Sequence, residues 1–124
     1  MFYKVEYQKR AHQEVEKIFR VLFPEQGLAV REEQIRLCHE MLDALLGEQI
    51  ALCDAGVGIG KTYAYLVAGI VSSRSRDARG LANQPVLIST SSIALQNAVQ
   101  TEYLPLLSCI LLADGQIDRP LLSV

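Results

Sequence analysis

The sequence predicts an α/β fold in which a parallel sheet packs against helices. Two short, largely apolar stretches, residues 49–53 and 86–90, are interpreted as strands, and the second has the unbroken hydrophobicity of a buried parallel strand. A strongly apolar helix is expected between them from Lys61 onward, and this order predicts a right-handed βαβ crossover. A sheet usually has about four to six strands. We therefore expect a truncated sheet, completed by the rest of a larger domain or by a second copy.

The N-terminal part of the chain is predicted to be helical. Residues 6–22 place apolar side chains at helical spacing with charged side chains between them. Pro24 and Gly27 are expected to end this helix. A second amphipathic helix is predicted over residues 32–46, with Gly47 at its C-cap.

The C-terminal part is predicted to alternate between helices and loops. The helix from Lys61 is expected to end near residue 73, followed by an exposed loop over residues 73–85. Its basic residues are better explained as a solvated loop than as a DNA or phosphate contact; they are Arg74, Arg76 and Arg79. Ser91 or Ser92 should cap a helix that reaches Tyr103. Pro105 should interrupt or restart it, and a short apolar helix should follow over residues 106–112.

These elements suggest two units: an N-terminal helical segment, residues 1–27, and an incomplete nucleotide-binding domain, residues 28–124. The chain has 124 residues and a formal net charge of -2. This net charge argues against binding of nucleic acid through the overall charge of the protein. The absence of an apolar leader and of any membrane-length apolar run predicts a soluble, cytoplasmic protein without a membrane partner.

The cysteines and histidines of the chain fit no metal or disulfide pattern. Cys38, Cys53 and Cys109 form no CxxC pair and lie among apolar residues, so we expect reduced, buried thiols. His12 and His39 lie on predicted helices without ligand spacing, and neither is assigned a function.

Residues 55–62 match the phosphate-loop pattern [AG]xxxxGK[ST], with alanine first. Glycines let the backbone amides close on a phosphate, and the following helix directs its positive end at the same anion. The ammonium of Lys61 should reach the phosphates, and the hydroxyl of Thr62 should ligate magnesium. A glycine-rich turn without a ligand would leave the Gly-Lys-Thr ending unexplained. The predicted nucleotide contacts are Ala55, Gly56, Val57, Gly58, Ile59, Gly60, Lys61, Thr62 and Tyr63.

Three elements of the chain together resemble the DinG/XPD-like superfamily 2 DNA helicases. Residues 54–66 resemble their Walker A segment, E-A-G-T-G-T-G-K-T/S followed by an apolar helix containing A-Y-L. Arg31 and Gln34 resemble the R-x-x-Q element that precedes their first strand. Residues 87–96 are similar to motif Ia, commonly I-S-T-x-T-x-x-L-Q. The resemblance covers about residues 28–105.

The resemblance implies a three-layer RecA-like P-loop core, ATP and magnesium as ligands, and single-stranded DNA or DNA junctions as partners. It implies that Arg31 and Gln34 lie at the adenine, where Gln34 reads the base, and that Thr90 and Gln96 lie near DNA. Lys61 and Thr62 would then be catalytic in an intact enzyme that couples ATP hydrolysis to DNA unwinding.

The chain also departs from this family. Val57 and Ile59 replace two loop threonines, and Asp54 replaces a glutamate, which affects positioning of the γ-phosphate more than binding. An acidic Walker B box, an arginine finger, a second lobe and iron–sulfur cysteines are not recognisable in the sequence. We therefore expect no iron–sulfur cluster in this chain and no helicase-rate ATP hydrolysis by it alone, and we expect the missing lobes or a second copy as partners. The alternatives are another P-loop protein, such as a kinase or an AAA-type loader, or a non-enzymatic nucleotide-binding remnant.

Overall fold

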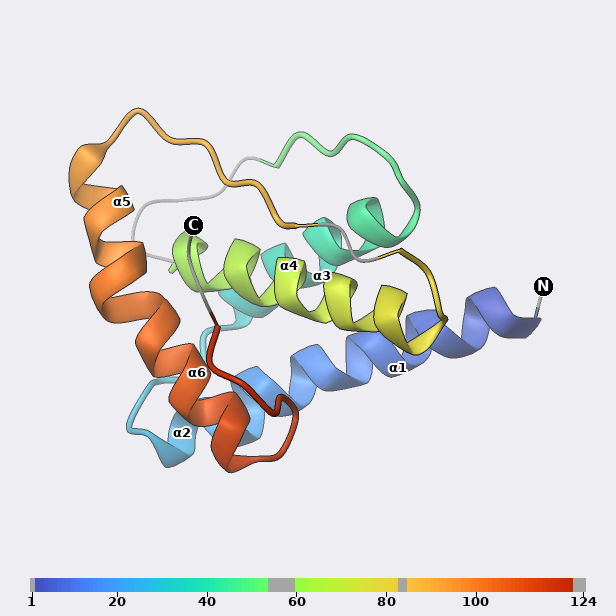
Figure 1. Ribbon diagram of the computed structural model, residues 1–124, viewed down its shortest axis with the longest axis horizontal. Helices are drawn as coiled ribbons and strands as arrows, with labels where there is room; N and C mark the ends of the chain where they lie inside the picture. The colour runs from blue at the N-terminus through green and yellow to red at the C-terminus, as the bar shows by residue number, and fades with distance from the viewer. Residues whose placement is uncertain (1, 54–59, 83–84, 122–124) are drawn as a thin grey trace.

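The computed structural model describes residues 2–53, 60–82 and 85–121, with the side chains of residues 2–5 excepted (Figure 1). Over these residues every regular element is helical. The elements are α1 (Phe2–Lys17), the π-helical turn η1 (Ile18–Leu22), α2 (Phe23–Glu25), α3 (Glu32–Leu46), α4 (Lys61–Ala78), α5 (Ile93–Ala98), the π-helical turn η2 (Val99–Tyr103) and α6 (Leu104–Ala113).

The predicted α/β fold is therefore wrong for the part of the chain that is described. Residues 49–53 and 85–90 form no ladder; they run as irregular chain along the side of the molecule away from α1 (Figure 1). Ile50, Leu52 and Leu87 are 95%, 99% and 92% exposed. An apolar run becomes a buried strand only where another strand pairs with it and a layer covers it. The described helices instead bury their faces against one another, so the three-layer RecA-like core and its truncated parallel sheet are not formed.

The N-terminal helical run is longer than predicted. It continues through η1 into α2 and ends after Glu25. Pro24 does not stop it, because Pro24 lies in the first turn of α2, where a missing N–H costs little. Gly27, with a φ of 80°, then turns the chain toward α3.

Helix α3 begins and ends at the predicted residues, Glu32 and Leu46. Gly47 is its C-cap residue, as predicted, but has a φ of -88°. The left-handed conformation that such a cap usually uses falls on Glu48 instead, with a φ of 54°.

Helix α4 lies at the centre of the molecule, between α3, α1 and the helical column of α5 and α6 (Figure 1). Its apolar residues are buried on several sides, as expected for a helix that is hydrophobic nearly all round. Val86 packs directly against Gly69 of this helix. A Cβ added at Gly69 would lie 2.9 Å from a methyl carbon of Val86.

The predicted loop over residues 73–85 is wrong in its first half, because α4 continues to Ala78. Each of its arginines has a partner within the chain. Arg74 pairs with Glu14 at 3.1 Å, Arg76 pairs with Glu48 at 3.9 Å, and the Arg79 guanidinium lies 3.8 Å from the centre of the Tyr7 ring. These contacts stabilise a polar end of the helix that composition alone assigns to a loop.

The C-terminal helices follow the predicted caps. The Ser92 hydroxyl accepts a hydrogen bond from the Leu95 N–H at 3.1 Å, which caps α5. Pro105 lies in the first turn of α6, which continues directly from η2 with Tyr103 and Leu104 in the right-handed helical conformation, so the predicted interruption at Pro105 is wrong.

The core is formed where α1, η1, α2, α3, α4 and α6 meet. Its largest fully buried side chains include Phe19, Phe23, Leu42 and Leu107. Cys38 is buried with them, and burial raises the pKa of its thiol to about 12, so it behaves as an inert hydrophobe. Cys109, in contrast, is exposed on α6, against the prediction of burial. Among the described helices, none is both long and apolar enough to cross a membrane.

Candidate nucleotide-binding site

The described part of the phosphate loop lies at the start of α4. Gly60 is the N-cap residue, in the left-handed conformation with φ 80° and ψ 44°, and Lys61 is the first helical residue. Lys61 is exposed and Thr62 is half-buried. The first N–H groups of a helix have no intrahelical acceptors, so they and the Lys61 ammonium present positive charge at one end of α4.

Most of the loop falls outside the described residues. The predicted phosphate contacts at Ala55, Gly56, Val57, Gly58 and Ile59 belong to that part, as does Asp54. The helix predicted after the loop is confirmed, whereas the strand predicted before it is not formed.

A hydrogen bond from α3 holds the described end of the loop. The side-chain amide of Gln34 donates to the Gly60 carbonyl over 2.9 Å. Gln34 is only 4% exposed, so this bond is shielded from water and fixes the backbone where α4 begins. The adenine contact expected of Gln34 stays a prediction. Arg31, its expected partner, is the N-cap residue of α3 and is exposed.

A side chain at Gly60 would displace the side-chain amide of Gln34. An added Cβ would lie 2.2 Å from the Gln34 side-chain nitrogen, and the φ of 80° disfavours any other residue. We expect Gly60→Ala to lower the free energy of unfolding by about 2–3 kcal/mol, since left-handed strain costs about 1–3 kcal/mol and the clash adds to it. Urea unfolding followed by circular dichroism measures this change.

Gly80→Ala is the matched control for this prediction. Gly80 has a φ of 71°, but nothing lies within 4 Å of its added Cβ, so this variant carries the strain without the clash. Adding Gln34→Ala to Gly60→Ala should recover part of the loss. Equal losses for the two glycine variants would show that Gln34 does not confine the loop.

Tyr63 anchors the first turn of α4 to the rest of the molecule. Its ring makes edge-on contacts with Phe23 of α2, at 5.1 Å between ring centres, and with Tyr103 of η2, at 4.9 Å. Burial, with Tyr103 and Glu102 nearby, raises the pKa of the Tyr63 hydroxyl. The predicted contact of Tyr63 with nucleotide is untested; what the structure shows is a packing role. Phe23 and Tyr103 have no counterpart in the sequence prediction, because their contact with the site is tertiary and leaves no local pattern.

The two residues predicted near DNA lie at the start of α5. The Thr90 hydroxyl accepts a hydrogen bond from the Ser92 N–H at 3.2 Å, so it helps to shape the cap of that helix. Gln96 is exposed on α5. This capping role is compatible with DNA contact, which stays a prediction.

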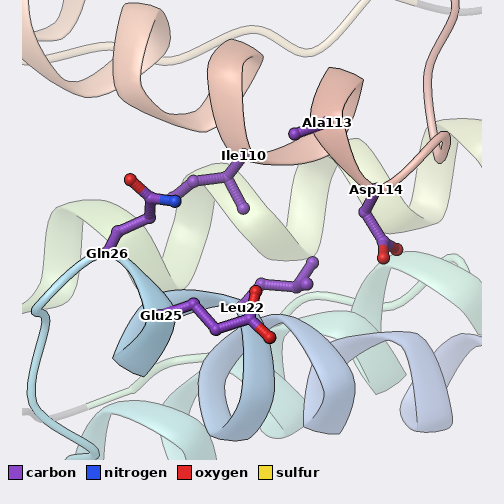
Figure 2. A pocket seen from close by; sticks show the side chains of 6 residues that line it. All are labelled: Leu22, Glu25, Gln26, Ile110, Ala113 and Asp114. Carbon is purple, nitrogen blue, oxygen red and sulfur yellow. The ribbon is translucent and has the colours of Figure 1, made fainter.

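A small pocket lies away from these residues, between the η1–α2 corner and α6 (Figure 2). Its lining comprises Leu22, Glu25, Gln26, Ile110, Ala113 and Asp114, and its volume is about 90 Å³. Ligand pockets usually measure about 300–1,000 Å³, so this cavity is too small for a nucleotide. Within the described ranges, no three His, Cys, Asp or Glu side chains are grouped to hold a metal ion, and Thr62 stays the one predicted magnesium ligand.

Comparison with known proteins relates this chain to a group of DNA helicases. A protein named 3'-5' exonuclease DinG, from Bacillus subtilis, is 36% identical over 92 residues, which is 73% of this chain. ATP-dependent DNA helicase YoaA from Escherichia coli is 33% identical over 91 residues, also 73% of the chain. The chain resembles the DinG-like helicases. ATP-dependent DNA helicase DinG from Escherichia coli is 31% identical over 84 residues, or 65% of the chain.

The match to DinG and YoaA covers only a small part of those proteins. The chain spans 9% of the Bacillus subtilis DinG, 13% of YoaA and 11% of the Escherichia coli DinG. No family model matches the chain, and no solved structure matches it significantly. The resemblance to DinG-like helicases that the three sequence motifs suggested is confirmed at the level of sequence.

Proposed function

We propose that the chain is the ATP-binding segment of a DinG-like DNA helicase. The observation that carries this proposal is the Gly60-Lys61-Thr62 ending of the phosphate loop at the exposed N-terminus of α4. A helix N-terminus with a lysine favours an anion, and the similarity to proteins named ATP-dependent DNA helicases supports ATP as that anion.

Each described residue of the site has a part in this proposal. Lys61 places its charge on the β- and γ-phosphates, and the Thr62 hydroxyl ligates the magnesium ion that accompanies them. Gln34 holds the Gly60 carbonyl, so the backbone just before Lys61 is fixed where it would meet the phosphates. Preorganisation of this kind lowers the entropic cost of binding.

The wider function belongs to the intact protein. We propose that ATP hydrolysis there is coupled to movement on single-stranded DNA, with Thr90 and Gln96 near the strand. The names of DinG and YoaA support this part of the proposal. The remaining helicase lobes, or a second copy of the chain, would supply the parts that this segment lacks. The exposed Ile50, Leu52 and Leu87 offer apolar surface for such a contact.

The test of the proposal is the magnesium dependence of ATP binding. Calorimetric titration of the chain with ATP should give tighter binding with magnesium than with EDTA. Thr62→Val removes the hydroxyl and keeps the side-chain shape, so it should weaken the magnesium complex on the order of tenfold, the worth of one charge-assisted contact.

Thr101→Val is the control for this experiment. Thr101 is exposed on η2, where its hydroxyl donates to the Asn97 carbonyl at 2.9 Å. This variant should bind magnesium–ATP as the wild type does. Equal affinity with and without magnesium in the wild-type chain would contradict the assignment of Thr62.

A further inference from the structure

A pair of histidines joins α1 to α3, outside the nucleotide site. The rings of His12 on α1 and His39 on α3 meet edge to edge, with their centres 4.8 Å apart and an interplanar angle of 30°. Their Nδ1 atoms lie 2.6 Å apart. The side chains are 27% and 24% exposed, so the contact is partly shielded from water. They are the two histidines of the chain.

Each ring is also held by a carboxylate at its outer nitrogen. His12 Nε2 lies 2.6 Å from an Asp43 carboxylate oxygen, and His39 Nε2 lies 3.2 Å from a Glu16 oxygen. Partial burial raises the pKa of Glu16, but hydrogen bonds from Arg20 and His39 outweigh it and bring the pKa below its ordinary value. A charged carboxylate only accepts hydrogen bonds, so both Nε2 atoms must donate.

The two Nδ1 atoms, which face each other and are called the inner nitrogens here, then determine how many protons the two rings carry. If both rings were neutral with hydrogen on Nε2, two lone pairs would face each other at 2.6 Å. If both rings were charged, two N–H groups would collide there. A single hydrogen between the Nδ1 atoms satisfies both rings, and the four ring nitrogens then carry three protons.

We propose that His12 and His39 share one proton as an imidazole–imidazolium pair, and that this bond makes the contact between α1 and α3 sensitive to pH. A zinc ion fits the gap less well. Zinc–nitrogen bonds of about 2.0–2.1 Å in tetrahedral geometry place two ligand nitrogens more than about 3 Å apart. No third metal ligand is grouped with the pair among the described residues.

The pH dependence has a defined sign on each side. As pH falls, a second proton places N–H groups on both inner nitrogens and breaks the bond between the helices. As pH rises, the shared proton is lost and the lone pairs repel. The contact is therefore strongest while a single proton lies between the two Nδ1 atoms.

The charges around the pair come from each neighbouring element. Glu16 of α1 and Asp43 of α3 face the rings directly, and Arg20 of η1 acts through Glu16. Two positions after His12 on α1, Glu14 pairs with Arg74 of α4 and not with the rings. Burial raises the pKa of Glu14 in spite of that pair.

The test is a titration of the imidazole nitrogens by NMR, on the ¹⁵N-labelled chain in buffer with EDTA. With two histidines in the chain, every signal belongs to this pair. We expect both rings to report the same two steps of proton uptake, because coupled groups titrate as a pair. In His12→Asn, His39 should titrate in one step.

A variant on the exposed side of α3 gives the control. Glu40→Gln removes a charge that pairs with Arg36 at 3.4 Å, and should leave both steps in place. Independent single-step titration of the wild-type histidines would overturn the proposal. Signals that change between samples with and without EDTA would identify a metal site in the gap and would also overturn it. If His12→Asn fails to fold, the wild-type titration still decides.

Discussion

Lys61→Ala is expected to weaken ATP binding by about 100-fold or more without unfolding the chain. A charge-assisted hydrogen bond contributes about 1.5–3 kcal/mol, and Lys61 is expected to contact two phosphates. The side chain is exposed at the first position of α4, so its loss removes no core packing. Calorimetric titration with magnesium–ATP measures the affinity, and far-ultraviolet circular dichroism checks the helices.

Lys17→Ala is the matched control for this loss of a lysine. Lys17, at the end of α1, pairs with Asp114 at 2.9 Å and has no place in the phosphate loop. Its removal should leave ATP affinity unchanged and cost little stability, because exposed ion pairs contribute about 0–1 kcal/mol. If the two lysine variants bound ATP equally well, the phosphate-loop assignment would be wrong.

Helices could be predicted from the sequence where one buried face repeats at helical spacing. Residues 32–46 show that spacing, and α3 has these bounds. The end of α4 could not be predicted this way. Its last turns are polar, and what stabilises them is contact with distant residues: Glu14 is 60 positions from Arg74 in the sequence.

The strands could not be predicted reliably for a related reason. Residues 49–53 and 86–90 have the composition of buried strands, but composition does not specify a pairing partner. In the structure Ile50 and Leu52 are almost fully exposed. The second segment contacts α4 through Val86 at Gly69, and the first contacts α3 at its start, where the Gln49 N–H donates to the Ala44 carbonyl at 2.8 Å.

The candidate site was predictable where it is local and not where it is tertiary. The phosphate-loop motif of residues 55–62 predicts Gly60, Lys61 and Thr62 at the start of α4. The motif is contained in eight consecutive residues, so it can be found in the sequence whether or not a strand precedes it. The bond from Gln34 to Gly60 joins residues 26 positions apart. The histidine pair is 27 positions apart. Neither spacing has a local signature, so only the packing of α1, α3 and α4 reveals these contacts.

The chain alone is expected to hydrolyse ATP at no more than the background rate, with or without single-stranded DNA. Phosphoryl transfer needs a phosphate cradle, magnesium, a group that orients water and usually an arginine finger. Lys61 supplies part of the phosphate cradle, and Thr62 supplies one ligand for magnesium. An arginine finger alone changes the rate by about 10³–10⁵-fold, so a chain without these parts should show almost no turnover. Phosphate release, measured with and without oligonucleotide, checks this.

The acidic residues that follow residue 90 explain why we expect no water-orienting group. Asp114 pairs with Lys17, which with Gln116 holds the pKa of that carboxyl below its ordinary value, and Asp118 lies 3.9 Å from Arg119. Glu102 is the exception, because its charge helps to raise the pKa of Tyr63 in the first turn of α4. DNA-stimulated hydrolysis that was lost in both Lys61→Ala and Glu102→Gln would contradict the prediction and identify Glu102 as the missing acid. Stimulated hydrolysis that rose steeply with protein concentration and survived Glu102→Gln would also contradict it, and would show that a second copy completes the site.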